Sequence, residues 1–222
     1  MYENKQSLET LDDIKRMMER SSRFISLSGL SGISAGICAL VGAWLAHKYI
    51  FTFQESIQNE VLPGEMRAGD SWILFNNLFL IAVGTLVVAI LSAFIFTWMK
   101  SKQQGIPIWG KSARRLLFNL SLPLAVGSIF LLRLIHFGNF AFIAPGCLIF
   151  YGLALINASK YTLNDIRYLG YLQIVLGIIN LWFVGYGLYF WAIGFGILHI
   201  VYGAFMWWKY ERVVQIETNK TN

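Results

Sequence analysis

This chain contains few charged residues. Of its 222 residues only 14% are Asp, Glu, Lys or Arg, whereas 56% are hydrophobic. In soluble globular domains charged residues occupy about a quarter of the positions. The composition therefore excludes a soluble core. Acidic residues are missing altogether from the six long apolar stretches, which argues against transport of cations or protons coupled to carboxylates.

Cysteine and the motifs of catalytic sites are also scarce. Cys38 and Cys147 both lie in apolar stretches, without the spacing of a metal site, and we interpret them as small packing residues. The chain has no phosphate-binding glycine loop and no His with an acidic partner nearby in the sequence. We therefore expect no metal, no cofactor and no catalytic residue, and a protein that is not an enzyme.

Six apolar stretches are each long enough to cross a bilayer as a helix, which takes roughly 20 residues. The fold class predicted is all-α, a polytopic membrane bundle of six transmembrane helices. Residues 1–23 are predicted to form an amphipathic cytoplasmic helix, and residues 209–222 a cytoplasmic tail. The first twenty residues hold no continuous apolar run, so the first span is expected to act as its own insertion signal. The predicted spans are 24–47, 72–98, 116–136, 140–158, 168–187 and 190–208.

The basic residues fall almost wholly on one side of these spans. Basic loops are retained in the cytoplasm, so both termini are predicted to be cytoplasmic. The same retention explains the net charge of +6 without a nucleic-acid partner. One side carries Lys5, Lys15, Arg16, Arg20, Arg23, Lys100, Lys102, Lys111, Arg114, Arg115, Lys160, Arg167, Lys209, Arg212 and Lys220, and the other only Lys48, Arg67 and Arg133.

The start of the chain offers two candidate contact surfaces. Residues 7–23 have helical apolar spacing, with acidic residues early and basic residues late, as suits an interfacial anchor or a helix that docks a partner. In the first span Ser28, Gly32 and Gly36 recur every four residues, and such a face lets two helix backbones approach closely. Its partner is another helix of the chain or, alternatively, a second copy in a homodimer.

Turn signals predict the connections. Residues 50–71, around Pro63-Gly64, are expected to form the longest loop, and Gly138-Asn139 a tight turn. Pro123 predicts a kink in the third span. The fifth and sixth spans are joined by so few residues that we expect an antiparallel hairpin with a glycine-rich corner at 184–187.

Four polar residues form a candidate intramembrane stripe on that hairpin: Gln173, Asn180, His199 and Tyr202. His199 lies midway between Trp191 and Trp207, so it is expected near the middle of the membrane. We predict that Asn180 pairs with His199, and Gln173 with Tyr202. Because unpaired polar groups in lipid are costly, the stripe is either a contact between helices or the lining of a site for a solute or a proton relay.

Arg133 and His136 lie one turn apart near the end of the third span. Their position favours interfacial anchoring, since the arginine head can reach the membrane surface. The alternative is an outward-facing contact with an anion or a lipid headgroup.

Two segments carry a resemblance to a known group of proteins. These are RSSRFISLSGLSGISAG at 20–36 and LGYLQIVLGIINLWFVGYGLYFWAIGFGILHIVYG at 169–203. They are similar to short six-helix integral membrane proteins of bacteria that have no assigned activity. The resemblance implies a bacterial inner membrane and carries over no functional residue.

Three functions remain open from the sequence. The first is a non-enzymatic interaction or regulatory membrane protein, favoured by the N-terminal helix and the first span. The second is a small-solute or proton permease lined by the intramembrane stripe. The third is a lipid-modifying enzyme that uses Arg133 and His136.

Overall fold

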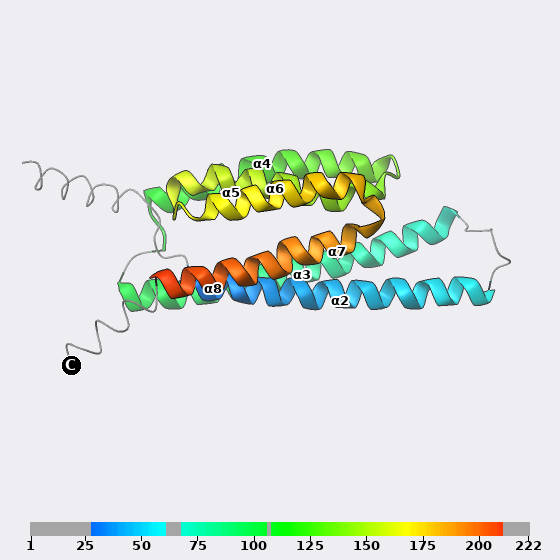
Figure 1. Ribbon diagram of the computed structural model, residues 1–222, viewed down its shortest axis with the longest axis horizontal. Coiled ribbons are helices and arrows are strands. Elements are labelled where there is room, and N and C mark those ends of the chain that lie inside the picture. Colours follow the sequence, from blue (N-terminus) through cyan, green and yellow to red (C-terminus); the bar gives the residue numbers. More distant parts are fainter. Residues whose placement is uncertain (1–27, 61–67, 106–107, 211–222) are drawn as a thin grey trace, which may run out of the picture.

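The computed structural model describes residues 28–60, 68–105 and 108–210, and within these ranges it is helical without a strand (Figure 1). The predicted helix at 7–23 lies outside the described residues, as does the tail after Tyr210. The elements are α2 (Gly29–Glu60), α3 (Ala68–Gln104), α4 (Lys111–His136), η1 (Phe140–Phe142), α5 (Ile143–Ala158), η2 (Ser159–Tyr161), α6 (Ile166–Trp182), η3 (Val184–Tyr186), α7 (Gly187–Trp191), the π-helical η4 (Ala192–Ile197) and α8 (Leu198–Tyr210).

Five helical segments are long and apolar enough to cross a membrane, so the chain has the character of a membrane protein. They are Gly29–Ser56, Trp72–Gln103, Lys111–His136, Phe140–Tyr161 and Val184–Tyr210. The sixth expected span, α6, is apolar but has only 17 residues. At about 1.5 Å per residue it is roughly 25 Å long, a little shorter than the hydrocarbon layer.

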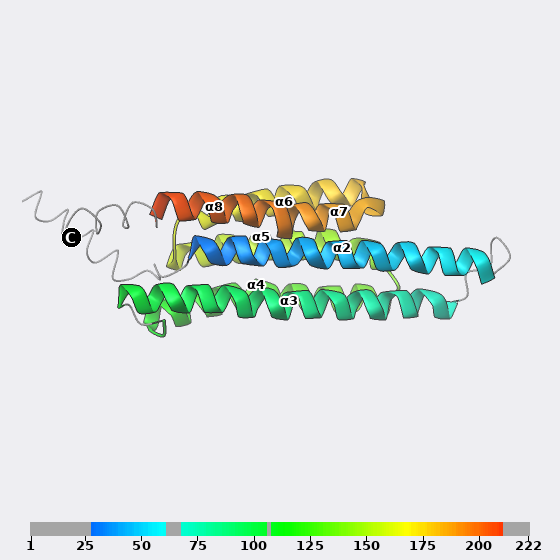
Figure 2. The same cartoon turned by 90° about the horizontal axis from the view of Figure 1, so that it is seen from below.

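The helices form two layers that face each other (Figures 1 and 2). In the α2 layer, α2 lies between α3 and the continuous arm of α7, η4 and α8. In the α5 layer, α5 lies between α4 and α6. The contact between the two layers is called the seam below. Because outward-facing side chains of both layers are large and apolar, the surface of the bundle suits lipid.

Several predicted boundaries differ from the structure. The first helix continues through residues 48–60, which we expected to belong mostly to the long loop. Residues 48–62 contain no glycine or proline, and a helix needs no apolar residue to continue beyond the membrane. α4 is continuous through Pro123, and the predicted turn at Gly138 is confirmed by its positive φ of 73°.

Glycines hold each layer together by direct backbone contact. A Cβ on Gly152 of α5 would lie 2.6 Å from the carbonyl oxygen of Gly170 on α6, and a Cβ on Gly170 would lie 2.8 Å from that of Gly152. In the α2 layer, a Cβ on Gly36 would lie 2.7 Å from the Gly196 carbonyl oxygen. Of the predicted small-residue face, Gly32 and Gly36 therefore pack against η4 and α8 of the same chain, and Ser28 is buried.

The expected hairpin of the last two spans takes a different form. The chain does reverse at the corner, where η3 joins α6 to α7. However, α6 packs mainly on α5, whereas α8 packs mainly on α2, so the two arms belong to different layers (Figure 1). The antiparallel reversal that we predicted is present, but each arm packs more extensively on a helix of its own layer than on the other arm.

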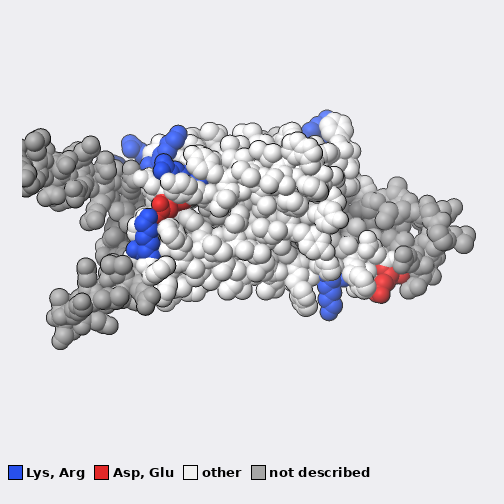
Figure 3. Space-filling view, viewed as in Figure 1, with Lys and Arg blue, Asp and Glu red and all other residues white. Residues whose placement is uncertain are grey.

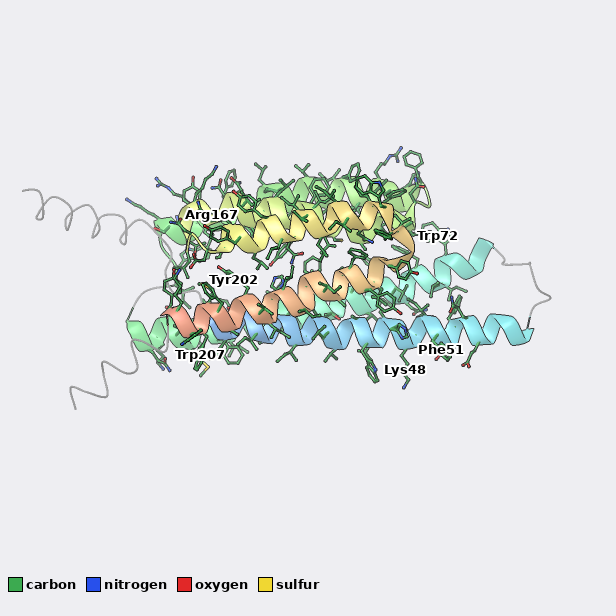
Figure 4. All side chains as sticks on the ribbon, viewed as in Figure 1. Lys48, Phe51, Trp72, Arg167, Tyr202 and Trp207 are labelled. Atoms are coloured by element: carbon green, nitrogen blue, oxygen red, sulfur yellow. The ribbon has the colours of Figure 1, made fainter. Side chains whose placement is uncertain are left out.

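Charged side chains lie near the two ends of the bundle, and none is visible across its middle in the view of Figure 3. The end at which α4 and α6 begin and α8 finishes is called the basic end. The described residues there include Lys100, Lys102, Lys111, Arg114, Arg115, Lys160, Arg167 and Lys209. The opposite end carries Lys48 and Arg133, and Lys48 points away from the bundle in Figure 4.

Candidate functional site

The predicted intramembrane stripe lies along the seam. Gln173 and Asn180 of α6 are completely buried, and His199 of α8 is 8% exposed. Tyr202, one turn after His199, packs against a small core of Leu155, Ile166 and Leu169, which belongs to the α5 layer. Figure 4 places Tyr202 between the two layers.

A π-helical turn supplies the central acceptor of the stripe. In an α-helix the N–H of Leu198 would bond the carbonyl of Gly194, four residues earlier. Here that N–H bonds the carbonyl of Ile193 instead. The Gly194 carbonyl therefore does not accept from Leu198 as it would in an α-helix. π-turns of this kind occur frequently at functional sites.

Two side chains bond the Gly194 carbonyl. The amide nitrogen Nε2 of Gln173 donates to it at 2.7 Å across the seam, and the His199 ring nitrogen Nδ1 lies 3.0 Å away. A Cβ at position 194 would lie 2.7 Å from Oε1 of Gln173 and would also overlap Leu148. A side chain at position 194 would therefore displace the ends of the Leu148 and Gln173 side chains from their present positions.

His199 also reaches the α5 layer through Tyr151. The Tyr151 hydroxyl lies 2.8 Å from His199 Nε2, and the two rings stack with centroids 5.5 Å apart. Phe195, on the π-turn, packs against Tyr151 with a centroid distance of 5.0 Å. The histidine is thus enclosed by aromatic rings and bonded at both nitrogens.

The predicted pairings within the stripe were wrong. Gln173 bonds the Gly194 carbonyl and not Tyr202. Asn180 donates from Nδ2 to the carbonyl of Phe183 at 3.0 Å, which closes the end of its own helix, and does not bond His199. We had paired residues of α6 and α8 that lie at the same depth in the membrane. This failed because the two helices belong to different layers, and Tyr151 of α5 bonds His199 instead.

Three buried polar atoms of the stripe have no hydrogen-bond partner among the described residues. They are Oε1 of Gln173, Oδ1 of Asn180 and the hydroxyl of Tyr202. Unpartnered buried polar atoms are rare, since each costs about 1–3 kcal/mol. All three atoms lie at the seam, where each retains the capacity to accept a hydrogen bond.

A polar contact joins the layers at the basic end. Asp165, just before α6, accepts hydrogen bonds from Lys209 Nζ at 2.6 Å and from the Tyr210 hydroxyl at 2.8 Å, both at the end of α8. Partial burial raises the pKa of the Asp165 carboxyl. The hydrogen bonds from Lys209 and Tyr210, with the charges of Lys209 and Arg167, outweigh this effect and hold the pKa below its ordinary 3.8.

Aromatic rings join the layers at the opposite end. The ring of Phe140 lies 4.7 Å from that of Phe75 and 5.9 Å from that of Trp72, measured between centroids. Phe140 follows α4, whereas Phe75 and Trp72 are on α3. The seam is therefore bordered by an ion pair at one end and by aromatic packing at the other.

Arg133 and His136 lie outside the seam. Both are exposed, and both contact Phe137: the Arg133 guanidinium is 4.5 Å from the ring centroid, and the His136 ring packs edge-on against it. A cation over an exposed aromatic ring at a helix end is typical of an interfacial anchor.

Sequence reasoning missed Tyr151 and the Gly194 carbonyl. Tyr151 was a polar aromatic residue in the middle of a span, beside Gly152, and that position could have marked it as facing another helix. The backbone carbonyl carried no side-chain signal. In the described ranges no three His, Cys, Asp or Glu side chains gather as a metal site would require.

Comparisons with protein families, with curated proteins and with solved structures find no match to this chain.

Proposed function

We propose that this chain is a multi-pass membrane permease that admits a small uncharged polar solute to the seam between its two helix layers. One observation carries the proposal: buried polar atoms of Gln173, Asn180 and Tyr202 lie along the seam without partners. A contact that served only to hold helices together would be expected to pair these atoms, because unpaired polar groups are costly in lipid.

The π-turn supports the same function. It shifts the backbone bond of Leu198 to Ile193, and the Gly194 carbonyl accepts from a side chain across the seam. Irregular backbone at membrane depth is tolerated where it lines a cavity or is buried in protein. Transporters use broken helices in this way to present main-chain groups to a solute. The absence of acidic residues from the six predicted spans favours an uncharged solute over a cation.

The interaction or regulatory hypothesis has less support. One of its two motives, the N-terminal helix, lies outside the described residues. In the other, the small-residue face of the first span, Gly32 and Gly36 are covered by η4 and α8 of the same chain. The lipid-modifying enzyme is weaker still, because Arg133 and His136 pack on an exposed phenylalanine ring.

The proposed orientation places the basic end and both termini in the cytoplasm of a bacterial cell, with the chain in the inner membrane. It rests on the positive-inside rule and on the resemblance described above. A reporter active only in the periplasm, fused after Asn222, is expected to be inactive. An active fusion would reverse the orientation.

Water access to residue 199 tests the permease. A single cysteine is placed there by His199→Cys in a Cys38→Ala, Cys147→Ala background, and membrane-impermeant thiol reagents are applied from each side of the membrane. Labelling from at least one side is expected. Ser128→Cys, on the exposed face of α4, is the control that should stay protected by lipid. Protection of residue 199 from both sides would contradict a solute path through the seam.

A further inference from the structure

The hydrogen-bond partners at the seam fix where its protons lie. The Gly194 carbonyl can only accept, so both Gln173 Nε2 and His199 Nδ1 must donate to it. In a neutral imidazole the other nitrogen, Nε2, is then an acceptor, and it receives the proton of the Tyr151 hydroxyl. The orientation of the Gln173 amide follows as well, because the reverse orientation would place two oxygens against each other.

The buried side-chain atoms of the seam that have no hydrogen-bond partner among the described residues are oxygens. Once Gln173 Nε2 faces Gly194, its Oε1 is left buried at the seam without a partner among the described residues. Oδ1 of Asn180 is left in the same state by the bond from Nδ2 to Phe183. Amide oxygens accept hydrogen bonds and carry partial negative charge, so they attract N–H and O–H groups and repel anions.

The surroundings of Gln173 Oε1 restrict both charge and size. The ionisable side chains that face this part of the seam are Tyr151, His199 and Tyr202, and no carboxylate is present in the described part of α5, α6 or α8 to compensate a cation. Leu148 and Leu176 close around Gly194 beside the amide. A group that enters here is therefore small and uncharged.

We propose that the seam recognises its solute through N–H or O–H groups donated to Oε1 of Gln173. The solute class is that of small uncharged hydrogen-bond donors, such as primary amides and polyols, and anions and fully N-methylated amides are rejected. This inference rests on the proposed permease function. It assigns Gln173 as the residue that determines specificity, with Gly194 and His199 holding its amide in the required orientation.

Thermal unfolding of the full chain in detergent tests the recognition step separately from transport. Acetamide is compared with N,N-dimethylacetamide, which has no N–H. A ligand that binds only the folded protein raises the melting temperature, by about 3 °C at a concentration tenfold above its dissociation constant. We expect acetamide to produce this rise relative to N,N-dimethylacetamide, and Gln173→Met to abolish the difference. Gln54→Met, the same change at an exposed position on α2, should preserve it.

Two results would overturn the inference. One is an equal effect of acetamide and N,N-dimethylacetamide on the unaltered protein, a comparison that holds even if Gln173→Met does not fold. The other is a folded Gln173→Met variant that keeps the full difference. Either result would leave the permease itself untouched.

Measurement of glycerol flux distinguishes a failure of the recognition by Gln173 from a failure of the proposed permease function. Swelling of proteoliposomes in a glycerol gradient is expected to exceed that of protein-free vesicles, and to fall about tenfold in Gln173→Met, the loss expected when a solute forfeits one hydrogen bond. Swelling equal to that of empty vesicles, with the acetamide difference intact, would overturn transport and leave recognition standing.

Discussion

Contacts within the layers differ in kind from contacts between them. Inside each layer, glycines bring backbones together, as Gly152 does with Gly170 and Gly203 with Gly29. Across the seam the layers meet through side chains: Tyr151 with His199 and Gln173 with the Gly194 carbonyl. Backbone contacts tolerate no added atom, whereas side-chain hydrogen bonds can be exchanged for water at little cost. Each layer is therefore expected to behave as a rigid unit, and the seam as the place where the bundle can open.

The largest effect is expected from crowding a contact inside a layer. In Gly203→Ala the new Cβ would lie 2.6 Å from both the Gly29 carbonyl oxygen and the Ile33 nitrogen, so α2 and α8 must separate. We expect a loss of about 2 kcal/mol or more in the free energy of unfolding, measured by melting in detergent. Gly84→Ala is the matched control, since nothing lies within 4 Å of its Cβ, and it should raise stability slightly. Equal results for the two variants would refute the tight contact.

Removing one hydrogen bond from the seam should have a smaller effect. Tyr151→Phe leaves Nε2 of His199 without its donor, which is expected to cost about 1 kcal/mol. Tyr171→Phe, at an exposed position on α6, should change stability by less than about 0.5 kcal/mol. A cost for Tyr151→Phe as large as that for Gly203→Ala would mean that the seam is as dry and rigid as the layers, and the distinction between them would fail.

The ion pair between Asp165 and Lys209 should contribute less to the free energy of unfolding than the Tyr151–His199 hydrogen bond does, and its contribution should depend on pH. The pKa of Asp165 is lowered in the folded protein, so the stabilisation is present above the ordinary value of 3.8 and is lost as pH falls through the lower, folded value. Because Lys209 is 45% exposed, we expect below about 1 kcal/mol. Melting temperatures between pH 7 and pH 3 should fall more for the unaltered protein than for Asp165→Asn. If melting temperature depended on pH in the same way in both proteins, Asp165 would not contribute to stability.

The smallest effect is expected outside both regions. Arg133→Gln and His136→Gln alter exposed side chains at the end of α4, and each should change the melting free energy by less than about 0.5 kcal/mol. Acetamide stabilisation and glycerol flux should be unaffected. A loss of flux in Arg133→Gln would extend the functional region beyond the seam.

Sequence reasoning located the apolar helices well but not their partners. Local sequence predicted the turn at Gly138, from the pair Gly138-Asn139, and the corner at η3, from the short connection between two apolar stretches. The positive φ of Gly138 confirms the turn. The end of α2 was not predicted correctly. Residues 48–60 contain no signal that ends a helix, and we interpreted their polar composition as a loop. Local sequence therefore predicts where a helix is possible better than where it stops.

The residues of the predicted stripe lie at the seam, but in a different arrangement from the one expected. Gln173, Asn180 and His199 are buried at the seam, yet their pairings differ from those expected. Equal depth on two consecutive helices predicts contact only if the helices pack directly on each other. Here α6 and α8 pack on different neighbours, and the decisive acceptor is a backbone carbonyl that no side-chain pattern encodes.

By itself, the sequence determined the class of this protein: its apolar runs demand lipid, and the uneven basic residues predict which end faces the cytoplasm, because transfer of charge across a bilayer is costly. Only the tertiary structure decided which helices pair, that Gln173 bonds the Gly194 carbonyl on the π-turn Ala192–Ile197, and that Tyr151 meets His199. These features depend on the steric fit of glycine faces between segments far apart in the chain, and such fit is a property of the assembled bundle.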